Sequence, residues 1–136
     1  MKILLIAVLL SALIFTIIDI IWLSYSVKNF YRPNLGQLLN DKPVIWAAIL
    51  FYFLYIFGLA VIVIHPAINY DSIINVFWKG AVFGLVAYGT YNLTNMATIK
   101  NWSPSVVFVD MFWGGSLTAF SAGTGLFVAK KILNIT

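Results

Sequence analysis

The sequence contains no cysteine among its 136 residues, and only 9% of the residues are charged. Without cysteine the chain can form no disulfide, no Cys-x-x-Cys redox pair, no thiolate metal site and no acylated cysteine anchor. Soluble domains carry roughly 25% charged residues, whereas this chain combines few charges with 62% hydrophobic residues. These proportions exclude an ordinary water-soluble fold and indicate an integral membrane protein.

The basic residues exceed the acidic ones by eight to four, which gives a formal net charge of +4. Apart from the adjacent Lys130 and Lys131, the lysines and the arginine stand singly at the edges of apolar runs rather than in a patch. That placement is typical of segments flanking a membrane, not of nucleic-acid binding. We therefore expect membrane lipids as partners and no nucleic acid.

Apolar runs at about 3–26, 44–64, 76–98 and 105–129 predict four membrane spans, since about 20 apolar residues suffice to cross a bilayer. The first run resembles a signal peptide, but it continues to Leu23 without a small-x-small cleavage site, so we expect it to be retained as a span. The predicted fold class is all-α, an integral membrane bundle of four antiparallel transmembrane helices in a single domain, 1–136. Little chain is left for a soluble catalytic domain.

The segments between the runs read as connections. Residues 28–43 predict a loop, in which 35–39 is weakly amphipathic and suited to a short interfacial helix. His65-Pro66 is expected to end the second span, because proline removes a helical hydrogen bond. Residues 69–72 predict a turn and 100–104 a tight connection. Aromatic residues near the predicted span ends suggest side chains at headgroup level, namely Tyr25, Tyr31, Trp46, Tyr70, Trp78 and Trp102.

Short connections make successive helices antiparallel, so both termini are expected on one side. The positive charges do not decide which side, because each side holds four: Lys2, Lys79, Lys130 and Lys131 against Lys28, Arg32, Lys42 and Lys100. The paired Lys130 and Lys131 beside a span favour cytoplasmic termini. Insertion in both orientations is an alternative.

Two of the four acidic residues, Asp19 and Asp110, fall inside predicted spans. A carboxylate at a helix centre costs about 2.5 to 3.5 kcal/mol on the insertion scale, so both should face protein or water. Helical rise puts each of them roughly 10 Å from the same side of the bundle. Each is followed by tryptophan at the third position, Trp22 and Trp113, on the same helical face. We expect the two aspartates to be neighbours.

The third and fourth runs add small and polar residues that suit helix contacts. Gly80 and Gly84 predict close approach of helices, and a polar group follows towards the carboxylates, namely Tyr88, Tyr91, Asn92, Thr94, Asn95 and Thr98. On the fourth run a stripe at helical spacing is expected to form the seam of the bundle, namely Asp110, Gly114, Thr118, Ser121 and Gly125.

These residues permit two interpretations. In the first, the aspartates only hydrogen-bond the amides and tyrosines and fix the helix register. In the second, they belong to an intramembrane polar pocket for a ligand or a proton, open to one face. The predicted pocket residues are Asp19, Trp22, Tyr88, Tyr91, Asn92, Asn95, Asp110 and Trp113. His65, the only histidine, has no ligand partners in the pattern, so neither a metal nor a cofactor is expected.

Several segments resemble a family of bacterial predicted membrane proteins, domain of unknown function 2177. They are Asp19-Ile-Ile-Trp-Leu23, Phe30-Tyr31, Leu54-Tyr55-x-x-Gly58, His65-Pro66, the run 80–98 and Asp110-x-x-Trp-Gly114. The run 84–95 is the most specific. The family pattern has aspartate where this sequence has Asn92, so a third carboxylate is not carried over. The resemblance implies a small bacterial inner-membrane protein and no particular activity.

Three functions are compatible with this pattern. The leading hypothesis is binding or transport of a small amphipathic molecule or lipid through the polar pocket. A more specific form of it couples transport to protons. A carrier of this size is expected to act as a homodimer. The second is an intramembrane enzyme that modifies a lipid with the two aspartates as acid and base. The third is a structural accessory subunit. The sequence leaves open whether the protein is an enzyme.

Overall fold

A computed structural model describes residues 1–70 and 72–134 of the protein. Over these residues the chain is helical and contains no strand. Four helical segments are long and apolar enough to cross a membrane, namely Lys2–Leu38, Ile45–Asn69, Ile73–Thr98 and Pro104–Ile132. The predicted all-α class with four transmembrane helices is confirmed.

The first segment is longer than expected. It runs through α1 (Lys2–Ser26), the π-helical turn η1 (Val27–Tyr31), α2 (Arg32–Leu35) and the 3-10 turn η2 (Gly36–Leu38). The predicted loop over 28–43 is therefore wrong for its first two thirds. Proline at the start of α2 lacks an N–H that a first helical turn does not need, so it does not break the run. Gly36, with φ of 54°, allows the change of direction after α2.

The second segment also continues past its predicted end. It comprises α3 (Ile45–Leu59), the π-helical turn η3 (Ala60–Ile64) and α4 (His65–Tyr70). The expectation that His65-Pro66 stops this span is wrong, because Pro66 lies in the first turn of α4, directly after the widened η3. Of the predicted turn over 69–72, Asn69 belongs to α4 and Ser72 caps the next helix, whereas Asp71 lies outside the described residues.

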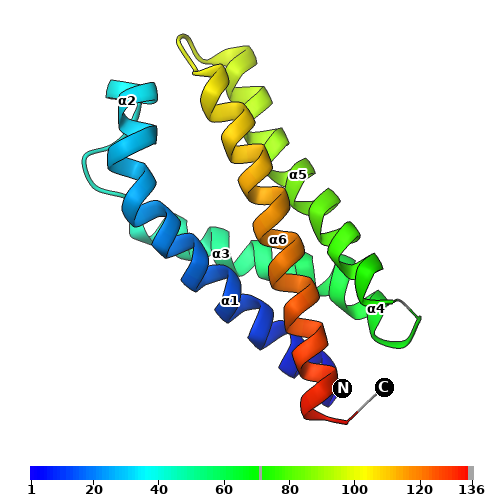
Figure 1. Ribbon diagram of the computed structural model, residues 1–136. Coiled ribbons are helices and arrows are strands. Elements are labelled where there is room, and N and C mark those ends of the chain that lie inside the picture. Colours follow the sequence, from blue (N-terminus) through cyan, green and yellow to red (C-terminus); the bar gives the residue numbers. More distant parts are fainter. Residues whose placement is uncertain (71, 135–136) are drawn as a thin grey trace.

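The long helices α5 (Ile73–Thr98) and α6 (Pro104–Ile132) form an antiparallel pair, and α1 packs on the other side of α6 (Figure 1). Helix α6 is the centre of the molecule, because 56% of its most apolar window is buried, against 22% in each of the other three spans. The start of α1 and the end of α6 lie at the same end (Figure 1). The tight connection predicted at 100–104 joins α5 to α6 at the opposite end.

Glycines permit the close contacts of α6 with its neighbours. A Cβ atom on Gly84 would lie 2.2 Å from the carbonyl oxygen of Gly114, and one on Gly125 would lie 2.1 Å from Oγ of Ser11. A Cβ atom on Gly80 would also touch the α6 backbone, 3.0 Å from the Cα atom of Ala119. All five members of the stripe predicted on this helix are buried, namely Asp110, Gly114, Thr118, Ser121 and Gly125. The helix-packing seam of α6 thus lies along the stripe that the helical spacing predicts.

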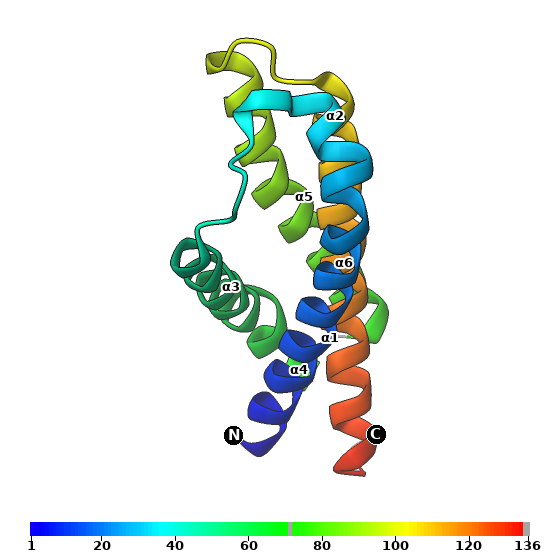
Figure 2. The same cartoon turned by 90° about the vertical axis from the view of Figure 1, so that its left-hand side faces the viewer.

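Helix α3 departs from a regular bundle. It crosses the layer formed by α1, α5 and α6 steeply rather than running alongside it (Figures 1 and 2). Only Tyr55 and Leu59 of α3 are buried, and large apolar side chains such as Phe53 and Leu54 are exposed. The four spans therefore form a core of three helices with a fourth beside it.

Candidate intramembrane polar site

The two intramembrane aspartates lie on facing, antiparallel helices. Asp19 on α1 is 4% exposed and Asp110 on α6 is 8% exposed. Helices α1 and α6 pack along much of their length, so the two Asp-x-x-Trp segments meet head to tail. The aspartate and the tryptophan of each segment are three residues apart and lie on one helical face. Because the two helices run in opposite directions, the tryptophan of each segment is brought towards the aspartate of the other segment.

The two segments are joined through their tryptophans. The Nε1–H of Trp113 donates to Oδ1 of Asp19 at 3.0 Å. The ring of Trp113 stacks on that of Trp22, with centroids 4.5 Å apart and planes 19° apart. Trp22 in turn donates from Nε1 to the hydroxyl of Tyr31 at 3.3 Å, and this hydroxyl donates to Oδ1 of Asp110. One continuous chain of contacts thus connects Asp19 with Asp110.

The direction of these bonds identifies Asp110 as an acceptor on both oxygens. Indole N–H can only donate, so the Tyr31 oxygen accepts from Trp22 and turns its own hydrogen to Asp110. The amide Nδ2 of Asn92 donates to Oδ2 of Asp110 at 2.8 Å and to the carbonyl oxygen of Tyr88 at 3.1 Å. Because both partners of this nitrogen are acceptors, the amide orientation is fixed. Both oxygens of Asp110 are therefore engaged by neutral hydrogen-bond donors.

Asp19 is held in a similar way. Besides Trp113, it accepts a hydrogen bond on Oδ2 from the hydroxyl of Tyr52 on α3, at 2.5 Å. Neither Asp19 nor Asp110 forms an ion pair in the described part of the chain, where the ion pair Arg32–Asp41 lies outside this network. Both carboxylates are therefore stabilised by neutral donors alone. Over the same residues, no group of three or more acidic, histidine or cysteine side chains could hold a metal ion.

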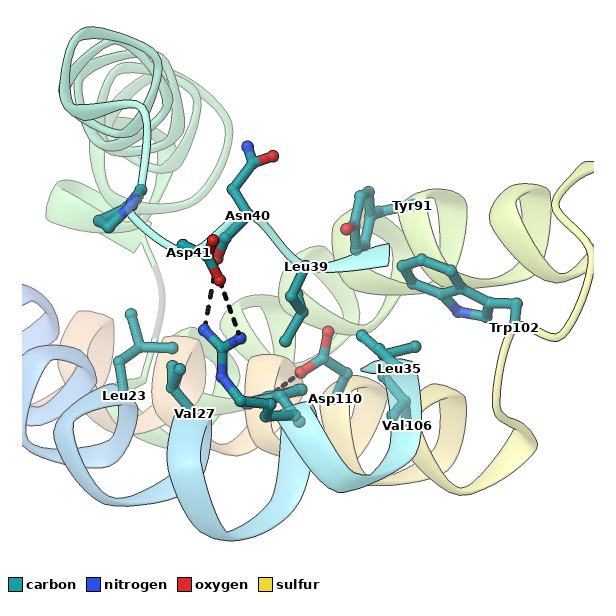
Figure 3. A pocket seen from close by; sticks show the side chains of 13 residues that line it. Leu23, Val27, Leu35, Leu39, Asn40, Asp41, Tyr91, Trp102, Val106 and Asp110 are labelled. Atoms are coloured by element: carbon teal, nitrogen blue, oxygen red, sulfur yellow. Dashed lines mark hydrogen bonds and ion pairs between the residues drawn. The ribbon is translucent and has the colours of Figure 1, made fainter. Parts of the chain in front are cut away.

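A cavity of about 400 Å³ opens beside Asp110 (Figure 3). It is lined by Leu23, Val27, Tyr31, Arg32, Leu35, Leu39, Asn40, Asp41, Pro43, Tyr91, Trp102, Val106 and Asp110. The Asp110 carboxylate points into the space between Leu35 and Leu39 (Figure 3). At the rim Arg32 pairs with Asp41 at 3.6 Å and donates to the carbonyl oxygen of Asn40 at 3.4 Å. The cavity is thus mostly apolar, with one buried carboxylate at its base.

A comparison with protein families matches residues 4–127 to the family described as "Predicted membrane protein (DUF2177)". The chain belongs to this family. The match covers most of the sequence, including both Asp-x-x-Trp segments and the cavity. Neither the curated proteins nor the solved structures gave a match. Membership in DUF2177 establishes a polytopic membrane protein and assigns no activity.

In this DUF2177 protein, five of the predicted pocket residues form the hydrogen-bonded and stacked network, namely Asp19, Trp22, Asn92, Asp110 and Trp113. Tyr91 and Asp110 also line the cavity. The ring of Tyr88 fills the space that a Cβ atom of Gly114 would occupy, and Tyr88 does not line the cavity beside Asp110. Asn95 is half-buried and does not line the cavity.

Sequence reasoning missed three tyrosines. Tyr31 was expected only as an aromatic residue at headgroup level, yet its side chain is 9% exposed and its hydroxyl bonds Asp110. Tyr52 bonds Asp19, and the Tyr55 hydroxyl bonds Thr118 Oγ1 at 2.6 Å. Phe30-Tyr31 and Leu54-Tyr55 do occur among the segments that resemble the family. The directions of these tyrosine side chains depend on the π-helical turn η1 and on the crossing angle of α3. Neither feature can be predicted from the periodicity of the sequence.

Proposed function

We propose that the protein binds a small amphipathic molecule in the cavity beside Asp110, as the first step of carrying it within or across the membrane. The observation that supports this most is the combination in one cavity of apolar walls with a single buried carboxylate. Ligand sites are typically clefts of about 300 to 1,000 Å³ with apolar walls and a few polar groups, and this cavity holds about 400 Å³.

The arrangement favours binding over acid and base catalysis. A pair of catalytic carboxylates has to reach the same reacting atoms. Asp19 is not among the residues that line the cavity, and both of its oxygens are engaged by Tyr52 and Trp113. A ligand in the cavity would meet Asp110 without Asp19. The site therefore resembles a receptor for one polar group with an apolar tail.

Binding can be tested with the purified protein in lipid nanodiscs, titrated calorimetrically with short-chain amphiphiles that carry cationic, neutral or anionic head groups. At least one class should bind in excess of empty nanodiscs. Leu39→Trp should abolish that binding by filling the cavity, whereas Ile49→Trp, on the exposed surface of α3, should preserve it. Absence of binding for every class, or equal binding by both variants, would contradict the proposal.

A further inference from the structure

We infer that the molecule bound beside Asp110 is a lipophilic cation, an ammonium group on an apolar tail; this inference rests on the proposed function and specifies its ligand. The charges that line the cavity are those of Arg32, Asp41 and Asp110. One positive and two negative charges leave a net charge of −1. Because Arg32 is paired with Asp41 at the rim, the uncompensated charge is that of Asp110 at the base.

The hydrogen bonds of Asp110 leave its charge uncancelled. Tyr31 and Asn92 are both neutral donors, and no Lys, Arg or His of the described chain pairs with this carboxylate. Neutral donors stabilise a buried carboxylate without neutralising it, so the charge of the ionised Asp110 side chain faces the cavity uncompensated. In surroundings of low polarity a cation gains more from that charge than it would in water. An anionic head group would be repelled.

Aromatic rings supply a second feature that suits a cation. Tyr31, Tyr91 and Trp102 all line the cavity, and the rings of Tyr91 and Trp102 meet edge to face at 5.7 Å. An ammonium group gains energy over the face of such rings, which is how aromatic sites recognise quaternary ammonium ligands. The tail would lie against the apolar wall formed by Leu23, Val27 and Val106.

The charge preference is tested with matched probes in nanodiscs of phosphatidylglycerol: hexyltrimethylammonium, neutral hexyldimethylamine oxide and anionic hexanesulfonate. The cation should bind about tenfold tighter than the amine oxide or better, and the sulfonate should not bind. In Asp110→Asn the cation should lose that advantage while the amine oxide still binds, which shows that the variant is folded. The comparison of probes on the unaltered protein requires no variant.

The outcomes separate this inference from the proposed function. If the amine oxide or the sulfonate binds as tightly as the cation, or if Asp110→Asn leaves the ratio unchanged, the inference is wrong while the binding cavity stands. If no probe binds, both are wrong. A second arm adds phosphatidylethanolamine to the nanodiscs. Competition by that lipid would identify a headgroup ammonium as the source of the cation, and its absence would identify a free amphiphile.

Discussion

At the scale of single residues, the polar centre of the protein depends on two short segments that hold each other's side chains. Trp113 reaches Asp19 directly, and Trp22 reaches Asp110 through Tyr31. The sequence predicts the four members of the two Asp-x-x-Trp segments and their common depth, because these follow from helical spacing. It does not predict Tyr31, whose direction is determined by the widened turn η1.

The stacked tryptophans predict a measurable coupling. In a double-mutant cycle of Trp22→Leu and Trp113→Leu, the interaction energy in unfolding should be about 0.5 to 1.5 kcal/mol, the usual strength of an aromatic pair. A cycle of Trp22→Leu with Trp78→Leu should be additive, because Trp78 is exposed near the start of α5. Thermal or denaturant unfolding in detergent provides the measurement. Additivity in both cycles would argue against the stacked arrangement.

Tyr31 should matter more than its position near a span end suggests. Tyr31→Phe removes a buried donor from Asp110 and leaves Nε1 of Trp22 without its acceptor, so we expect a destabilisation of about 1 to 3 kcal/mol. Tyr25→Phe is the matched control, since Tyr25 is exposed and lies six residues earlier. Equal unfolding temperatures for the two variants would contradict a buried Tyr31 hydroxyl that bonds Asp110.

At the scale of the elements, periodicity and glycine spacing account for the α1, α5 and α6 core, and they fail for α2 to α4. The stripe on α6 and the close approach at Gly84 follow from small residues at helical intervals. The proline at 66 was predicted to end a helix, yet it occurs at the start of α4, directly after a π-helical turn. The crossing of α3 depends on the contacts of Tyr52 and Tyr55 with residues far away in the sequence. Local sequence patterns do not predict such contacts.

The contact between α5 and α6 predicts a difference between two glycine substitutions. Gly84→Ala would put a Cβ atom 2.2 Å from a backbone oxygen of α6, and we expect a loss of about 1 to 3 kcal/mol or more from overpacking. Gly115→Ala would meet its nearest atom at 3.4 Å, an ordinary contact, and should change stability little. Unfolding of both variants in the same detergent gives the comparison. Similar stabilities would contradict the close packing of these helices.

At the scale of the whole molecule, α2 and the connection from α5 to α6 lie at one end, and the start of α1 and the end of α6 lie at the other (Figures 1 and 2). The cavity belongs to the first of these ends, because Leu35 of α2 and Trp102 of the connection both line it. Under the proposed function, the side from which a ligand reaches the cavity is the side of the membrane on which this end lies. The equal charge count leaves that side undetermined by the sequence, because the positive-inside rule needs an imbalance.

The absence of natural cysteine makes the arrangement testable by labelling single cysteines on intact cells with a membrane-impermeant maleimide. Cysteines at Gln37 and at Asn101 should react from the same side, and one at Lys2 from the opposite side. With cytoplasmic termini, which the paired Lys130 and Lys131 favour, the first two react with a reagent applied outside the cells. If the cysteines at positions 2 and 101 react from the same side, the four-span fold is contradicted. If all three cysteines react from both sides, the protein inserts in both orientations.

The most direct test of the central claim, a ligand cavity beside Asp110, is photoaffinity labelling in nanodiscs followed by mass spectrometry. The probe is a short alkyl diazirine that carries the head group of the tightest binder in the calorimetric panel. We predict cross-links confined to the cavity wall, on α1 and η1 between Leu23 and Tyr31, on Leu35 and Leu39, and near Trp102 and Val106, all removed by excess unlabelled binder. Cross-links spread over the exposed face of α3, unchanged by excess binder, would show that the probe merely dissolves in lipid and that the cavity is not a binding site.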